Sequence, residues 1–128
     1  MQFLIDTHLA LWWQGMREKV PRVARDLIEV PENDVFVSRV SLWEMAIKVN
    51  QGNLKLDLAR FCARMIEDGF AWLPIENEHL LQLAELPVFA DHKDPFDRLL
   101  VAQSLSEPLI LLTRDARLTR YGTTIRVV

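Results

Sequence analysis

The sequence predicts an α/β fold with three layers, in which helices cover both faces of a mostly parallel sheet. Residues 3–5 and 109–112 are short apolar runs without polar alternation, which is typical of strands buried on both faces. Segments with helical spacing of apolar residues separate such runs along the chain, and this alternation is typical of an α/β/α arrangement. The length of 128 residues predicts a single domain that spans residues 1–128.

The expected elements of the first half begin and end at residues with known local roles. They are strand 3–5, helix 7–15, helix 21–30, strand 35–37 and a helix from about 41 to 52. Thr7 is a helix-capping residue, and Pro21 suits a helix start because a backbone N–H is not needed there. Ser41 and Glu44 match a capping box, and Gly52 is a suitable helix stop.

The second half alternates in the same way. Its expected elements are helix 57–69, weak strand 72–75, helix 77–87, helix 94–106, strand 109–112, a short helix to about 121 and strand 125–128. Asp57 and Asn77 can cap their helices, and Pro74 favours an edge position for its strand. Asp94 is expected to cap a helix that has Pro95 at its first position. Residues 96–102 are too apolar for a surface helix, so we expect this helix to be buried on most sides.

Composition excludes several classes of protein. The net charge of −3 argues against a protein that coats nucleic acid through bulk positive charge. One cysteine, Cys62, forms no internal disulfide, which favours a reducing cytoplasmic compartment. Asp6 interrupts the first apolar run, so no signal peptide is expected, and no apolar run approaches the roughly 18 residues of a membrane span.

Four acidic residues are expected at one edge of the sheet. Asp6 follows the first strand, and Asp115 lies just past the end of strand 109–112. Glu44 and Asp97 are each expected in the first turn of a helix that begins near the same edge. Because ligands of open parallel sheets bind at the carboxyl ends of the strands, we expect these four carboxylates to converge.

Converging carboxylates would repel one another unless a cation neutralised them. An all-oxygen site of this kind suits Mg²⁺ or Mn²⁺. A bound cation lowers the pKa of water to make a nucleophile, and a pair of cations can stabilise the attacking and leaving oxygens in phosphodiester cleavage. Asp94, about one helical turn before Asp97, is expected at the rim of the site.

Each acid also has a purely structural interpretation. Asp6 can be an ordinary acid at a strand end, and Asp97 can simply complement the helix dipole. Glu44 can close the capping box and pair with Lys48 one turn later, while Asp115 can cap the short helix that follows. These alternatives are plausible singly, but four acids at one edge by coincidence is a less economical explanation.

Basic residues near the acids have a similar ambiguity. Arg114, Arg117 and Arg120 lie beside Asp115 and could contact phosphates, although a solvated helix face is the more common arrangement. The histidines His8 and His92 are near the predicted site, and the sequence assigns neither of them a role. With Cys62, the histidines form no zinc-binding spacing.

Four short segments resemble the signature blocks of bacterial PIN-domain proteins. In chain order they are Ile5-Asp6-Thr7-His8, Ser38-Arg39-Val40-Ser41-Leu42-Trp43-Glu44, His92-Lys93-Asp94-Pro95-Phe96-Asp97-Arg98 and Leu112-Thr113-Arg114-Asp115. The branch they resemble most is the VapC-like toxins of type II toxin–antitoxin pairs. The resemblance runs from the first strand to the last and implies a PIN-like domain.

This resemblance also implies a function. It implies a Mg²⁺- or Mn²⁺-dependent endoribonuclease that hydrolyses RNA phosphodiester bonds with metal-activated water. The implied site consists of Asp6, Glu44, Asp97 and Asp115. Our own hypothesis for the mechanism is that the first three hold the metal, and that Asp115 holds it through water or binds a second ion. The resemblance further implies a homodimer that is inhibited by a small antitoxin protein, which inserts a peptide near the active site.

Three other classes of protein are alternatives to a nuclease. A haloacid-dehalogenase-like phosphohydrolase also has an Asp after its first strand, but needs a second Asp where this chain has His8. A receiver-like signalling domain needs adjacent acids after the first strand and a lysine after the last buried strand, and neither is present. A catalytically inactive PIN-like protein-binding module would retain the acidic cluster, and RNA binding without cleavage would identify it.

Overall fold

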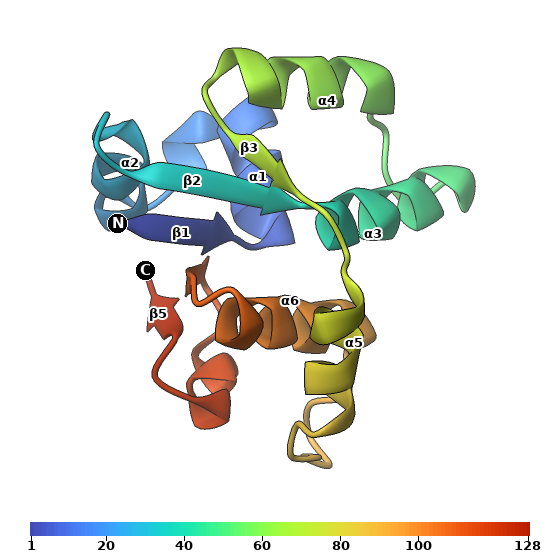
Figure 1. Cartoon of the computed structure of the whole chain (residues 1–128). Coiled ribbons are helices and arrows are strands. Elements are labelled where there is room, and N and C mark those ends of the chain that lie inside the picture. Colours follow the sequence, from blue (N-terminus) through green and yellow to red (C-terminus); the bar gives the residue numbers. More distant parts are fainter.

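A computed structural model, which describes residues 1–128, confirms the three-layer α/β/α fold (Figure 1). Its five strands lie in the order β3-β2-β1-β4-β5, and every neighbouring pair is parallel. The strands are β1 (Gln2–Ile5), β2 (Asp34–Ser38), β3 (Ala71–Leu73), β4 (Ile110–Thr113) and β5 (Ile125–Val127). The strand before Pro74 lies at an edge of the sheet, as the proline predicts.

Helices cover both faces of this sheet. They are α1 (Thr7–Gly15), η1 (Arg17–Lys19), α2 (Arg22–Glu29), α3 (Arg39–Asn50), α4 (Leu58–Glu67), α5 (Asn77–Ala84), α6 (Pro95–Ser106) and η2 (Ala116–Tyr121). In Figure 1, α1, α2 and α4 lie on one side of the sheet, whereas α5, α6 and η2 lie on the other. No helix combines the length and the apolar character required to cross a membrane.

Alternating strand residues supply two hydrophobic cores. Phe3 and Ile5 of β1 belong to the core that includes residues of α1, α2 and α4. Leu4, between them, belongs to the core that includes residues 99–102 of α6. These three side chains are fully buried, which explains why residues 3–5 are apolar at every position rather than at every second one.

Two helices are capped by an earlier residue than the sequence predicts. Thr7 does not cap α1, because Asp6 accepts the Leu9 N–H at 2.9 Å and takes that role. Similarly, Ser38 caps α3 by accepting the Val40 N–H at 3.0 Å, so Ser41 does not begin a capping box. As a consequence, Glu44 lies in the second turn of α3 and not in its first turn.

The remaining helix starts follow the sequence more closely. Asp57 caps α4, and Asp94 caps α6 with Pro95 at the first helical position, as predicted. The prediction of Asn77 as a cap is wrong by one residue, because Glu76 forms a capping box with His79. Capping requires only that a side-chain acceptor reach the first free N–H groups, so neighbouring acceptors compete for it.

A buried glutamine joins α6 to the other elements. Gln103 is fully buried, and its Oε1 accepts a hydrogen bond of 2.6 Å from the Ser38 hydroxyl at the end of β2. Its Nε2 donates to the Pro74 carbonyl at 3.1 Å and lies 3.2 Å from Nδ1 of His79. These contacts fix α6, whose first turn carries Asp97, relative to the carboxyl ends of β2 and β3.

We expect Gln103→Ala to lower the free energy of unfolding by about 2–4 kcal/mol, because it leaves a cavity and unpaired buried polar groups. Gln82→Ala is the matched control, since Gln82 lies in α5 and its side chain forms no hydrogen bond in the structure. The control should change the free energy by less than about 0.5 kcal/mol. Urea denaturation followed by circular dichroism measures both, and equal values would contradict the structural role of Gln103.

Candidate metal centre

Three of the four predicted acids share one open pocket of about 540 Å³ at the carboxyl edge of the sheet. Asp6 reaches it from the end of β1, Asp115 from the end of β4 and Asp97 from the first turn of α6. The complete lining is Asp6, His8, Trp12, Asp94, Asp97, Arg114, Asp115, Ala116 and Arg117. The structure therefore brings together acids that are up to about a hundred residues apart in sequence, as the sequence predicts for a parallel sheet.

Asp6 is held by hydrogen bonds to both of its carboxylate oxygens. Its side chain is buried, with Oδ1 accepting the Leu9 N–H and Oδ2 accepting the Thr113 hydroxyl at 2.7 Å. Burial raises the pKa of Asp6, although both hydrogen bonds act in the opposite direction. The Thr113 hydroxyl also accepts the backbone N–H of Asp115 at 3.0 Å, so this residue links the two acids. Sequence reasoning missed Thr113, although a polar residue at the end of an apolar strand was a usable signal.

Glu44 does not line this pocket. It is buried in α3, where Oε1 accepts the Thr7 hydroxyl at 2.8 Å and Oε2 accepts the Lys48 ammonium at 2.9 Å. The pairing with Lys48 confirms one part of the structural alternative, whereas the capping box with Ser41 that was its other part does not form. Glu44 is nevertheless near enough for its negative charge to raise the pKa of Asp97.

Asp97 has a strongly perturbed carboxylate. Burial, together with the negative charges of Asp94, Asp6 and Glu44, raises the pKa of Asp97 to about 6. No lysine or arginine pairs with Asp97, in contrast to Glu44. Asp94 contributes charge from the pocket wall, but its Oδ1 already accepts the N–H groups of Phe96 and Asp97. A divalent cation would relieve this repulsion at Asp97.

Asp115 carries its own positive partner. Nε and Nη2 of Arg117 donate to its two carboxylate oxygens at 3.1 and 2.9 Å, which lowers the pKa of Asp115. Oδ1 of Asp115 also accepts the Arg117 N–H and caps η2, as the structural interpretation predicted. Asp115 therefore reaches the pocket in its charged form.

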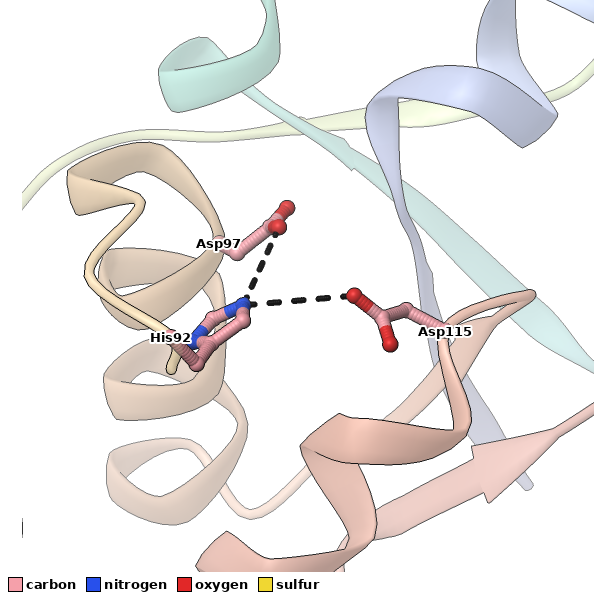
Figure 2. Close-up of side chains that lie close together, drawn as sticks. All are labelled: His92, Asp97 and Asp115. Carbon is pink, nitrogen blue, oxygen red and sulfur yellow. Dashed lines mark ion pairs between the residues drawn. The ribbon is translucent and has the colours of Figure 1, made fainter. Parts of the chain in front are cut away.

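His92 is the site residue that sequence reasoning left without a role. Its ring is buried, and Nε2 lies 3.5 Å from Oδ2 of Asp97 and 3.9 Å from Oδ2 of Asp115 (Figure 2). One ligand atom from each of these three residues lies within 4.8 Å of the others. Its position five residues before Asp97 was the available signal, but the conformation of the intervening loop decides where the ring points.

The donor set fits a divalent metal ion. Carboxylate oxygens are ligands for Mg²⁺ and Mn²⁺, and a neutral imidazole nitrogen is a common ligand for transition metals. Nε2 of His92 is buried without a hydrogen-bond partner, and burial together with neighbouring negative charges raises the pKa of Asp97. A cation bound between them would satisfy both atoms.

The pocket lies within a stretch that matches a known protein family. Residues 3–123 match the PIN domain. This chain belongs to the PIN-domain family. The matched residues include all four acids predicted from the sequence, so the expected family membership is confirmed.

Similar proteins cover nearly the whole of this PIN-domain chain. Ribonuclease VapC22 of Mycobacterium tuberculosis is 26% identical in an alignment over 127 residues. The alignment covers 92% of this chain and 90% of that relative. A chain of VapBC2 from Rickettsia felis, solved bound to a promoter DNA fragment, matches with a TM-score of 0.71 at 12% identity, covering 100% of this chain and 98% of that chain. A chain of a toxin–antitoxin complex from Klebsiella pneumoniae matches with a TM-score of 0.66 at 18% identity, covering 97% and 95%. The two solved structures show that this PIN-domain chain shares their fold.

We expect Asp97→Asn to stabilise the metal-free protein at pH 7. The pKa of Asp97 is about 6 in the folded protein, above its ordinary value of 3.8, so folding is favoured at low pH. That contribution is present below about pH 4 and is lost as the pH rises through 6. The variant should therefore gain about 1–2 kcal/mol over wild type at pH 7, allowing for solvent screening, and almost nothing at pH 4.

Denaturation in a chelating buffer at the two pH values measures this difference. Asp91→Asn is the control, because its carboxylate pairs with Arg120, which lowers the pKa of Asp91. Its substitution should have the opposite sign, destabilising the protein at pH 7. A loss of stability in Asp97→Asn at pH 7 would contradict the proposed repulsion.

Proposed function

We propose that this chain is a divalent-cation-dependent endoribonuclease and the toxin component of a toxin–antitoxin pair, with residues 1–128 acting as one PIN-like domain. The observation that carries this proposal is the convergence of Asp6, Asp97 and Asp115 on one pocket of a PIN-domain chain. The similarity to ribonuclease VapC22 over 127 residues supports RNA as the substrate. The alternative of a catalytically inactive binding module is an outcome of the experiment below.

The proposed metal ligands are Asp6, Asp97 and Asp115, with Glu44 close by, and the proposed ion is Mg²⁺ or Mn²⁺. When bound, such an ion neutralises the carboxylates, polarises the RNA phosphodiester and makes an attacking water more acidic. Asp6 is prevented from rotating by its bonds to the Leu9 N–H and the Thr113 hydroxyl. This preorganisation lowers the entropic cost of placing a substrate phosphate against the site.

Basic residues at the pocket would hold the RNA backbone. Arg114 and Arg117 both line the pocket, and guanidinium groups bind phosphate oxygens through N–H donors. Arg117 already donates to both carboxylate oxygens of Asp115, so we assign phosphate binding to Arg114. Local positive charge is needed because the whole protein has a net charge of −3. Glu44 would contribute negative charge without rotating, since Thr7 and Lys48 hold both of its oxygens.

A protein partner and a homodimer belong to the same proposal. The similar chains solved in VapBC2 from Rickettsia felis and in the Klebsiella pneumoniae toxin–antitoxin complex support an antitoxin as the partner. The molar mass of the purified chain in solution tests the homodimer. The same measurement after co-expression with the small protein encoded by the adjacent gene tests the antitoxin complex.

Substitution of the proposed ligands should abolish RNA cleavage. We expect Asp6→Asn and Asp97→Asn each to reduce cleavage of a structured RNA by at least about a hundredfold, because a metal contributes several kcal/mol to transition-state stabilisation. Asp26→Asn is the control, since its exposed side chain lies in α2 and outside the pocket. Gel analysis of RNA products with Mn²⁺ or Mg²⁺, and with chelator, measures the effect.

Circular dichroism should show that each variant remains folded. Full activity of Asp6→Asn in a preparation free of contaminating nuclease would overturn the proposed site. RNA binding by the wild type without any cleavage, in either metal, would instead identify an inactive binding module.

A further inference from the structure

His92 is the buried polar residue that the proposed function leaves unused. The whole residue is only 3% exposed, and its Nε2 has no hydrogen-bond partner. The two other buried atoms without partners, Nε of Arg25 and of Arg98, belong to guanidinium groups that donate through Nη2. Burying an imidazole nitrogen without a partner costs free energy, so this atom requires an explanation.

Nε2 of His92 points between two acids that come from different elements (Figure 2). Its distances of 3.5 Å to Asp97 and 3.9 Å to Asp115 are too long for good hydrogen bonds. Two ligand atoms about 2.1 Å from a metal lie about 3.0 Å apart at 90° and about 3.6 Å apart at 120°. The distance to Asp97 falls within this range, and the distance to Asp115 is slightly longer. A small inward movement of either carboxylate would complete the geometry.

Tyr121 sets the orientation of the ring from its other side. The Tyr121 hydroxyl lies 3.1 Å from Nδ1 of His92. The two rings pack edge to face, with their centroids 5.8 Å apart. The backbone N–H of His92 also donates to the Phe89 carbonyl at 3.2 Å. With the proton on Nδ1 and donated to Tyr121, the lone pair of Nε2 faces the acids. A metal-binding histidine commonly uses its second nitrogen in this way.

We propose that Nε2 of His92 binds the metal ion together with the carboxylates of Asp97 and Asp115, and that this nitrogen ligand makes the site prefer Mn²⁺ to Mg²⁺. The proposal rests on the proposed metal site at Asp97 and Asp115, and adds a ligand and a metal preference. Mg²⁺ strongly prefers oxygen ligands and octahedral geometry, whereas Mn²⁺ accepts imidazole nitrogen. The sequence predicted an all-oxygen site from the acids alone and assigned His92 no role.

The direct test is pulsed electron paramagnetic resonance of Mn²⁺ added to the metal-free protein in the absence of RNA. A bound imidazole gives a hyperfine coupling from its directly coordinated ¹⁴N nucleus. We expect this coupling in wild type and its loss in His92→Asn. The matched control is His8→Asn, because His8 lines the same pocket with an exposed side chain. That variant should retain the coupling.

Calorimetric titration with Mn²⁺ and Mg²⁺ gives an independent readout. We expect wild type to bind Mn²⁺ at least about tenfold more tightly than Mg²⁺. His92→Asn should weaken Mn²⁺ binding by about ten- to a hundredfold and Mg²⁺ binding by much less, which removes the preference. The His8→Asn control should keep the wild-type preference.

The wild-type spectrum decides the proposal even where His92→Asn fails to fold. One outcome would be that Mn²⁺ binds wild type but not Asp97→Asn, and that the wild-type spectrum shows no ¹⁴N coupling. This outcome would overturn the role of His92 without contradicting the proposed nuclease. Absence of Mn²⁺ binding to wild type would also overturn it. RNA cleavage with Mg²⁺ then decides separately whether the nuclease proposal survives.

Discussion

The register of β1 between its two neighbours is the constraint on which the site depends. Ile5 pairs with Val37 on one side and with Leu112 on the other, so the three strands end within one residue of the same level. The Asp6 N–H extends this ladder by donating to the Leu112 carbonyl at 3.1 Å. A shift of one residue would turn Asp6 into the opposite core, and burial of apolar residues on both faces of β1 prevents it.

The negative charges of the clustered carboxylates are stabilised by different partners. Hydrogen bonds from neutral donors hold Asp6, whereas the cations of Lys48 and Arg117 neutralise Glu44 and Asp115. Asp97 has no such cation, and burial together with the neighbouring negative charges raises its pKa to about 6. An added divalent ion would therefore offset both the burial and the repulsion of this carboxylate.

Helix α6 is anchored in the hydrophobic core and thereby fixes the position of Asp97. Its middle is buried against the sheet, Asp94 fixes its first turn and Gln103 joins its later turns to the ends of β2 and β3. Asp97 is thus held on a rigid element and not on a loop. The loop before α6 carries His92, which Tyr121 and the Phe89 carbonyl hold from the opposite side.

The sequence by itself determined the fold class, the edge of the sheet where the acids converge and the start of α6 at Pro95, because apolar periodicity and capping are local properties. Tertiary structure decided which of several nearby acceptors caps α1 and α3, and so moved Glu44 into a second turn beside Thr7 and Lys48. It also placed His92 in the site, since its ring direction depends on Tyr121, which is 29 residues away in the chain. Contacts at such separations leave no periodic pattern in the sequence, which is why the folded protein alone revealed them.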